Sequence, residues 1–358
     1  MMKTILPEFG LDPDKCHVKA YGSGLINHTW RITDSHNDYI LQRINNKVFT
    51  RPLDIAFNIH TIAEYFNQHH PRYLFTVPKQ TINKEEIVYS PNEGYFRLFP
   101  FIENSHTIDV VMNPQQAWEA SRQFGMFTKL LADLPAVQLK ITIPDFHNLS
   151  LRYQQFEEAL EKGNKDRIIQ SDSTIRFIQK NREILNQFER IKMSPDFKLR
   201  VTHHDTKISN VLFDPSNKGI CVIDLDTLMP GYFISDVGDM MRTYLSPANE
   251  EEKDFSKIEV REDFFRAILE GYLGEMWDEL STDEINHFVY AGKFMIYMQA
   301  IRFLTDYILN DHYYGAKYPD HNLVRAGNQQ VLLEKLVKQE KRFNEIVQAY
   351  KHEVIVNG

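Results

Sequence analysis

The order of strand and helix patterns along the chain constrains its fold more than any other feature. Short runs rich in β-branched and aromatic residues, separated by turn residues, crowd the first hundred residues and are typical of strands. These runs lie at 17–22, 28–34, 39–45, 87–90 and 95–99. One helical pattern, from Pro52 to Gln68, lies among them.

After residue 103, apolar residues recur mainly at helical spacing. The helical patterns span 114–132, 150–191, 262–277, 282–309 and 327–350. Only three short strand-like runs between residues 199 and 225 interrupt them. Strands first and helices later predict an α+β fold. We expect two lobes: a small, mainly β lobe over residues 1–103 that binds nucleotide, and a large, mainly helical lobe over 104–358.

The composition narrows the class of protein. The chain has 358 residues and a formal net charge of −8, which argues against a nucleic-acid partner. No run approaches the roughly 20 apolar residues of a membrane span, and we see no signal peptide. The two cysteines, Cys16 and Cys221, cannot form a disulfide framework and fit a reducing compartment. We therefore expect a cytoplasmic protein that acts on small molecules, with no obligate protein partner evident.

The segment from Thr202 to Asp226 carries an unusual number of polar residues between strand-like runs. Alternation along the run 219–226 places Asp224 and Asp226 on the same face of a strand. Carboxylates at the exit of an apolar strand are unfavourable unless they are solvated, paired or bound to a cation. Mg²⁺ prefers such oxygen ligands.

The spacing within this segment points to a particular chemistry. His203, Asp205 and Asn210 match the kinase catalytic-loop pattern H-R-D-x-x-x-x-N, with His204 in place of the arginine. Asp224 follows 14 residues beyond the asparagine, where the kinase pattern has its metal-binding aspartate. Phosphoryl transfer needs one carboxylate to orient and deprotonate the acceptor hydroxyl. It also needs a second carboxylate and an amide to hold the metal.

Two other interpretations of these residues stay open. Asp205 and Asn210 could simply cap turns. Alternatively, His203, His204 and Asp205 could be the metal ligands of a hydrolase. Adjacent histidines on an extended chain point to opposite sides, which makes them poor ligands for a single ion.

The segment from Tyr21 to Asn27, between two strands, contains the glycines expected of a phosphate-covering loop. A plain hairpin turn would also explain them. The third strand lacks the phosphate-pairing lysine of the kinase pattern, and Gln42 or Arg43 occupies its place, depending on register. The helix that follows supplies no certain lysine partner.

Several segments together support a family resemblance. They are YGSGLIN, YILQRIN, FIE at 101–103, VTHHDTKISNVLFD, IDLDTLMPG, SDVGDMMR, RFLTDY and KYPDHNLVR. From about Tyr21 to Arg325 the chain resembles the aminoglycoside-phosphotransferase and choline-kinase branch of the protein-kinase-like fold. Its last four motifs are similar to those of bacterial N-acetylhexosamine 1-kinases.

The resemblance implies roles for individual residues, with ATP as phosphoryl donor and Mg²⁺ as cofactor. Asp205 would be the catalytic base, and Asn210 and Asp224 would hold the metal. The nucleotide would be bound by Gly22, Ser23, Gly24, Gln42, Phe101, Ile102 and Glu103. The sugar would be bound by Asn27, Asp205, Arg302 and Tyr313. Supporting roles would fall to Lys207, Asp226 and Arg242.

The sugar-binding residues have ordinary explanations as well. Arg302 and Tyr313, 11 residues apart, would share a face if one helix ran through both. Without the resemblance, Arg302 could pair with Asp306 at i+4, and Tyr313 could be an ordinary half-buried tyrosine. We expect Asp236 to be scaffold, whereas the role of Arg242 stays open.

The implied activity is ATP-dependent phosphorylation of the anomeric hydroxyl of N-acetylhexosamines. Leu25 stands where better-known members of the group have histidine near the sugar, so the preferred sugar is not implied. A kinase of another small alcohol or sugar is one alternative. A non-catalytic nucleotide-binding protein is another, because the lysine is absent.

Overall fold

The computed structural model describes residues 1–22 and 26–357. Ser23, Gly24 and Leu25 lie outside the described residues. The chain divides into two compact units, which we call the small unit and the helical unit. The small unit comprises Met1–His106, Asp133–Pro144 and Leu212–Pro230, and the helical unit comprises Thr107–Ala132, Asp145–Val211 and Gly231–Gly358.

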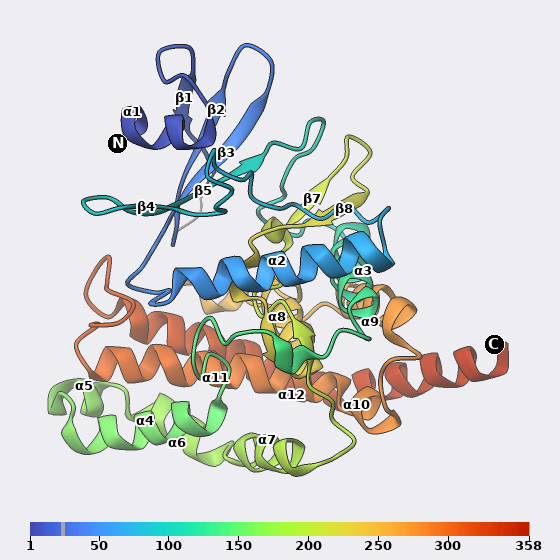
Figure 1. Cartoon of the computed structure of the whole chain (residues 1–358). Coiled ribbons are helices and arrows are strands. Elements are labelled where there is room, and N and C mark those ends of the chain that lie inside the picture. The colour runs from blue at the N-terminus through green and yellow to red at the C-terminus, as the bar shows by residue number, and fades with distance from the viewer. Residues whose placement is uncertain (23–25, 358) are drawn as a thin grey trace. The chain divides into compact units, whose positions relative to one another are not determined.

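The small unit is built on a five-stranded antiparallel sheet (Figure 1) with strand order β1-β2-β3-β5-β4. Its strands are β1 (His17–Ala20), β2 (His28–Thr33), β3 (Asp38–Ile44), β4 (Val88–Ser90) and β5 (Gly94–Pro100), with α2 (Pro52–His69) between β3 and β4. All five strands and this helix are predicted by the sequence to within two residues at each end. The sheet register places Gln42 directly opposite Arg97.

One face of this sheet forms the core of the small unit. Ile32, Leu41 and Leu98 are fully buried there. They cluster with Ile5 and Phe9 of the N-terminal segment, which forms α1 (Met2–Ile5) and the 3₁₀ turn η1 (Leu6–Phe9). The alternation of apolar and polar residues along the strands thus directs one set of side chains into this core.

The chain around the motif segment forms shorter strands than the sequence predicts. They are β6 (Arg200–Thr202), β7 (Val211–Phe213), β8 (Gly219–Val222) and β9 (Met229–Gly231), and β7 and β8 pair as a hairpin. Because β8 ends at Val222, the expected alternation does not reach the aspartates. Asp224 has a left-handed backbone (φ 60°, ψ 62°), and the 3₁₀ turn η4 (Leu225–Thr227) follows it.

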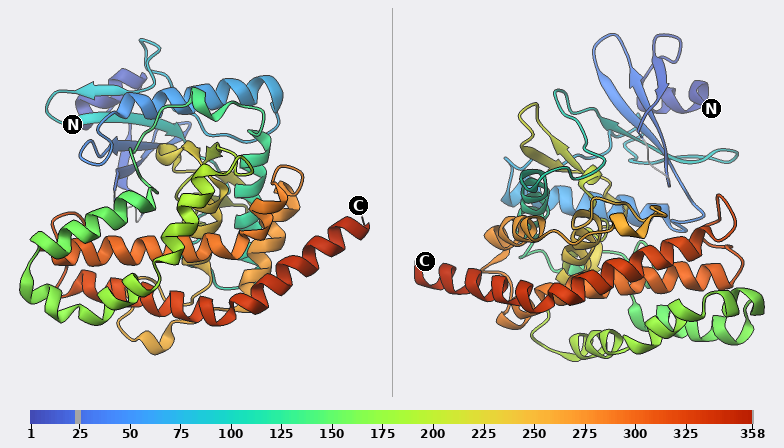
Figure 2. Two further views of the ribbon diagram at one scale, coloured as in Figure 1. Left: turned by 90° about the horizontal axis from the view of Figure 1, so that it is seen from below. Right: turned by 180° about the vertical axis from the view of Figure 1, so that it is seen from behind.

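The helical unit contains the long helices that the sequence predicts, some of them divided, and one helix over residues 233–244 that lies outside the predicted ranges. They are α3 (Pro114–Leu130), α4 (Leu149–Lys162), α5 (Lys165–Gln170), α6 (Asp172–Lys180), α7 (Glu183–Met193), α8 (Phe233–Tyr244), α9 (Glu262–Met276), α10 (Thr282–Asn286), α11 (Phe288–Ile308) and α12 (His321–Asn357). Helix α11 is buried along most of its length and contacts α4, α8 and α12. Both views in Figure 2 show α12 running along α11 and extending beyond it.

Local chemistry fixes where these helices begin and how closely they pack. Asn113 caps α3 by accepting a hydrogen bond from the Gln116 amide, and Pro114 occupies the first turn. Gly238 lets α8 approach α11 closely, since a Cβ there would lie 2.4 Å from the carbonyl oxygen of Ala291. Among the described residues, no helix combines the length and apolar character needed to cross a membrane.

Candidate active site

In the helical unit, Asp205 and Asn210 form a bonded pair. The Asn210 Nδ2 donates to the Asp205 backbone carbonyl at 2.8 Å and to its Oδ2 at 3.1 Å. A 3₁₀ turn, η3 (Ile208–Asn210), brings the asparagine back toward the aspartate. Lys207 Nζ lies 2.9 Å from Asp205 Oδ1. The five-residue spacing therefore does bring these side chains together, and the Asn210 oxygen is left for another partner.

Neighbouring charged and polar groups keep the Asp205 carboxyl group ionised. Burial alone would raise the pKa of its carboxyl group, but Lys207, His203 and the Asn210 amide together lower it below its ordinary value. The negative charge of Asp205 in turn raises the pKa of Lys207. An ionised, oriented carboxylate can accept a hydrogen bond, and then a proton, from a hydroxyl group.

Asp236 on α8 holds the backbone of this loop. Its carboxylate accepts hydrogen bonds from the amides of His203 at 3.0 Å and His204 at 2.7 Å. The hydroxyl of Thr206 donates to its backbone carbonyl at 2.7 Å. Burial raises the pKa of Asp236 to about 7. This residue is scaffold, as its sequence context suggests.

The two histidines do not form a metal pair. The His203 ring packs edge-on against Phe124 at 5.2 Å, whereas the His204 ring lies 5.3 Å from His147. His204 has a positive φ of 65°, which turns the backbone at this point. Among the described residues, no group of three or more histidines, cysteines or carboxylates could hold a metal ion. The hydrolase interpretation has no structural support.

In the small unit, Asp226 and Arg97 form a fully buried ion pair. Arg97 Nη2 lies 2.5 Å from Asp226 Oδ1, and the two side chains are 1% and 2% exposed. Arg97 Nε donates to Gln42 Oε1 at 3.0 Å, and Asn27 Nδ2 donates to Asp226 Oδ2 at 2.7 Å. Asn27, which follows the glycine segment, is thereby tied to the turn after Asp224.

Arg97 is a buried charged residue that sequence reasoning missed. Its Nε donates to Gln42 Oε1, whereas the neighbouring Arg43 pairs with Glu93 at 3.6 Å. A cation therefore does lie beside the β3 position that lacks lysine, but it is supplied by β5. The signal in the sequence was one arginine inside the apolar strand run YFRLFP.

Helix α2 holds the chain segment that follows Asp226 in the small unit. Asn58 is fully buried, and its Nδ2 donates to the carbonyls of Lys140 and Leu228, both at 2.8 Å. Its Oδ1 accepts a hydrogen bond from the Lys140 amide at 2.7 Å. A buried amide with all its groups bonded anchors the chain just beyond Asp226.

The remaining nucleotide-binding candidates lie at the end of β5 and in the glycine segment. The Phe101 amide donates to the carbonyl of Asp38 at 3.0 Å, and its ring meets Tyr21 edge-on at 6.1 Å. Ile102 accepts a hydrogen bond from the Ser105 hydroxyl at 2.6 Å, and Glu103 is exposed. Gly22 has a positive φ of 78°, which glycine adopts without strain.

Arg302 on α11 lies among aromatic rings. Its guanidinium carbon is 5.6 Å from the Phe146 ring centroid, 5.9 Å from that of Tyr313 and 5.5 Å from that of Tyr314. Arg302 Nη1 donates to Gln299 Oε1 at 3.1 Å. No ion pair between Arg302 and a carboxylate is found among the described residues.

Two possibilities that the sequence left open in this region are not realised in the structure. Helix α11 ends at Ile308, so Tyr313 lies in the following turn rather than on the same helix as Arg302. Asp306 does not pair with Arg302 but accepts hydrogen bonds from the amides of Tyr313 at 2.7 Å and Tyr314 at 2.9 Å. Nevertheless, the turn brings the Tyr313 ring to Arg302, with its side chain 69% exposed.

Comparison with known proteins identifies the family. Residues 17–281 match the model of the phosphotransferase enzyme family, abbreviated APH. The chain belongs to this family. The match includes the catalytic-loop motif and parts of both units, and it ends before α11 and α12.

Solved structures agree with the fold. A microcompartment-associated aminopropanol kinase superposes with a TM-score of 0.68 at 12% identity, covering 96% of this chain and 97% of the other. A spectinomycin phosphotransferase, solved with ADP and spectinomycin, gives 0.58 at 13% identity, with 95% and 97% covered. A Plasmodium vivax ethanolamine kinase gives 0.56 at 13% identity, with 91% and 85% covered. This phosphotransferase therefore has the protein-kinase-like fold, with a small antiparallel-sheet unit and a large helical unit.

Proposed function

We propose that this phosphotransferase transfers the γ-phosphoryl group of ATP to the anomeric hydroxyl of an N-acetylhexosamine, with GlcNAc and GalNAc as favoured acceptors. The surroundings of Arg302 are the single observation that most supports this acceptor class. The sugar-kinase motifs in RFLTDY and KYPDHNLVR support it as well.

Asp205 would act as the general base. Its Oδ1 faces Lys207 and its Oδ2 faces the Asn210 amide, so the carboxylate has a defined orientation. The lowered pKa of Asp205 leaves it ionised at neutral pH and ready to accept the proton of the sugar hydroxyl. Positioning and electrostatic stabilisation are the main contributions that a protein can make to phosphoryl transfer, and Asp205 would position the acceptor hydroxyl as well as accept its proton.

The polar groups present fit Mg²⁺. Asn210 uses its Nδ2 on Asp205, so its Oδ1 would be the atom that binds the metal. Asp224, in the left-handed turn after β8, would contribute a carboxylate. Such hard oxygen ligands suit Mg²⁺, which would neutralise the charge of the transferred phosphoryl group. Asp226 is engaged by Arg97 and Asn27, so we assign it the support of this turn rather than direct ligation.

The surroundings of Arg302 suit a neutral sugar better than a cation. An amino alcohol, choline or aminoglycoside is bound through carboxylates or through the faces of aromatic rings. Here the rings of Phe146, Tyr313 and Tyr314 surround a guanidinium of the protein itself. An ammonium group would be repelled by Arg302, whereas sugar hydroxyls and an N-acetyl carbonyl can accept its hydrogen bonds.

Arg97 bears on the alternative of a non-catalytic nucleotide-binding protein. The absent lysine was the reason to consider that alternative. Arg97 contacts Gln42 at the position that lacks lysine, but its charge is paired with Asp226 and its side chain is 1% exposed, so it does not replace the lysine. We favour an active kinase because Asp205 and Asn210 are paired as the catalytic-loop pattern requires.

A coupled assay of ADP release across a panel of acceptors tests the proposal. The panel contains GlcNAc, GalNAc, glucose, choline, ethanolamine, aminopropanol and spectinomycin. We expect ADP release with the N-acetylhexosamines and background rates with the four amines. Turnover with an amine and none with any sugar would refute the proposed acceptor class.

A further inference from the structure

A continuous series of polar contacts runs through the helical unit, beginning at the catalytic loop. Asp239 Oδ2 accepts a hydrogen bond from the amide of Thr206, the residue after Asp205, at 2.9 Å. Asp239 Oδ1 accepts two hydrogen bonds from Arg242, at 3.0 Å from Nε and 2.9 Å from Nη2. The remaining nitrogen, Nη1, donates to Glu250 Oε2 at 2.7 Å.

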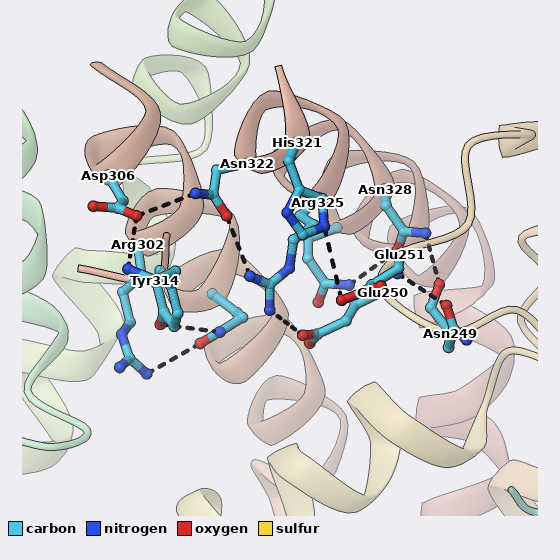
Figure 3. Close-up of polar contacts among 12 residues, drawn as sticks. Asn249, Glu250, Glu251, Arg302, Asp306, Tyr314, His321, Asn322, Arg325 and Asn328 are labelled. Atoms are coloured by element: carbon cyan, nitrogen blue, oxygen red, sulfur yellow. Dashed lines mark hydrogen bonds and ion pairs between the residues drawn. The ribbon is translucent and has the colours of Figure 1, made fainter. Parts of the chain in front are cut away.

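Glu250 joins this first half of the series to a second half. Its other oxygen, Oε1, accepts a hydrogen bond from Arg325 Nη2 on α12, as Figure 3 shows. Burial alone would raise the pKa of Glu250, but Arg242 and Arg325 lower it to about 2. Glu250 therefore stays charged, and a charged group between two guanidinium groups has one preferred position.

The second half of the series reaches the turn that carries Tyr313. Arg325 Nη1 donates to Asn322 Oδ1 at 3.2 Å. Asn322 Nδ2 lies 3.1 Å from Asp306 Oδ2, 2.9 Å from Asp311 Oδ1 and 2.9 Å from the Gly315 carbonyl oxygen. Asp306 in turn accepts hydrogen bonds from the backbone amides of Tyr313 and Tyr314. Figure 3 shows Asp306 between Tyr314 and Asn322.

The turn itself depends on these contacts. Asn310, Asp311 and Gly315 all have positive φ angles, of 64°, 60° and 70°. Non-glycine residues hold such angles only where surrounding contacts compensate for the strain. Asn322 is fully buried and Asp306 is 4% exposed, so neither can exchange these partners for water.

We propose that Glu250, Asn322 and Asp306 are positioning residues that set the acceptor-binding turn, through Tyr313, against the Asp205 loop. None of the three is a catalytic residue. Each acts through a chain of bonds that ends on a backbone amide of Thr206, Tyr313 or Tyr314. The inference rests on the proposed function only in taking Tyr313 and Arg302 as acceptor contacts.

Such a link matters because phosphoryl transfer depends on the distance between the acceptor hydroxyl and its base. A displacement of about 1 Å between reacting groups can lower the rate on the order of 10²-fold. The two ends of the series lie on separate loops, so rigid elements alone do not fix their separation. The series of charged groups supplies that constraint.

Three variants and one matched control test the inference by steady-state kinetics. Glu250→Gln removes the charge shared by both halves, so we expect kcat to fall and the KM for acceptor to rise, each about tenfold. Asp306→Asn loosens only the turn and should raise the acceptor KM about tenfold with kcat within threefold. In both variants the KM for ATP should stay within twofold.

Arg325→Lys is the conservative variant. It keeps a positive charge beside Glu250 but loses the hydrogen bond from Nη1 to Asn322, so we expect a raised acceptor KM with a near-normal kcat. It also keeps the test decisive if Glu250→Gln does not fold. Glu340→Gln is the control, because Glu340 pairs with Lys293 at 2.7 Å and is 32% exposed, close to the 28% of Glu250. Glu340→Gln should leave kcat, the acceptor KM and the ATP KM within twofold of the wild-type values.

The acceptor is whichever alcohol the wild-type chain phosphorylates in the panel assay. If that alcohol is an amine and not a sugar, the proposed function fails. The changes in kcat and acceptor KM, compared with those in the ATP KM, still test the positioning role. A fall in thermal stability with unchanged kcat and acceptor KM in Glu250→Gln and Asp306→Asn would overturn the inference. So would a change in the ATP KM as large as that in the acceptor KM.

Discussion

The small unit and the helical unit hold their key carboxylates in different ways. In the small unit, Asp226 is paired with one guanidinium, that of Arg97, and both groups are almost completely removed from solvent. In the helical unit, Glu250 is partly exposed and is shared between Arg242 and Arg325. When one member of a buried one-to-one ion pair is removed, the other is left as a buried charge without a counter-charge. When a carboxylate that is shared by two arginines is removed, the arginines are partly exposed and can find other partners. We conclude that the Asp226–Arg97 pair mainly stabilises the small unit. The contacts of Glu250 with Arg242 and Arg325 mainly fix the positions of the loops in the helical unit.

The largest expected effects separate the two aspartates of the small unit. Asp224→Asn should abolish Mg²⁺-dependent turnover with little change in thermal stability, because the residue is assigned to the metal. Asp226→Asn leaves Arg97 buried without its counter-charge, and this should lower the free energy of unfolding by about 3–5 kcal/mol. Activity assays and chemical denaturation of both variants provide the measurement. An inactive but fully stable Asp226→Asn would reverse the two assignments.

In the helical unit, the base should matter for rate rather than for nucleotide binding. Asp205→Asn should lower kcat by roughly 10²-fold or more, the range expected for a lost general base. The dissociation constant for ADP, measured by calorimetry, should change little. Asp254→Asn, which alters an exposed capping carboxylate, is the control. Turnover within threefold of wild type would remove Asp205 from the mechanism.

The acceptor residues should affect the sugar alone. Arg302→Ala removes directional hydrogen bonds at a cost of about 1–3 kcal/mol, so the sugar KM should rise roughly 5- to 150-fold. Tyr313→Phe should produce a smaller rise in the same constant. Arg182→Ala is the matched control, since Arg182 also lies over a tyrosine ring, 5.2 Å from that of Tyr153. A higher ATP KM with an unchanged sugar KM in Arg302→Ala would show that the acceptor site lies elsewhere.

The last expected effect concerns stability alone and is a pH dependence that comes from Asp236. Burial raises its pKa in the folded protein to about 7, above the ordinary aspartate value of 3.8, so folding takes up a proton between these pH values. The contribution of Asp236 to stability is therefore present below about pH 4 and declines as the pH rises to about 7. The stability difference between Asp236→Asn and wild type should shift in favour of the variant over this window. Denaturation midpoints at pH 5 and pH 8 measure it, and a constant difference would contradict the assignment.

Much of the fold follows from local patterns in the sequence. The strands of the small sheet and helices such as α3, α9 and α11 were predictable from periodicity alone. The kinase-like spacing of Asp205 and Asn210 suggested that the two side chains lie close together, and a loop and one 3₁₀ turn do bring them within hydrogen-bonding distance. Local interactions fix these features, so a single sequence contains the information.

Other features depend on tertiary contacts and were not predictable. Asp306 binds the backbone of Tyr313 and Tyr314 rather than Arg302, because a turn with positive φ angles replaces the expected helix. The partnership of Arg97 with Asp226 joins residues 129 positions apart, and no periodicity reveals it. The left-handed backbone of Asp224 likewise ends β8 earlier than alternation suggests.

The most direct test of the proposed function is the identity of the product in a competition experiment. The chain is incubated with Mg²⁺, ATP and equal concentrations of GlcNAc and ethanolamine, and the products are identified by ³¹P NMR. We predict one new phosphate monoester whose phosphorus couples to the anomeric proton of the sugar, with no phosphoethanolamine. Phosphoethanolamine as the product, or a sugar phosphorylated at a position other than the anomeric carbon, would contradict the account.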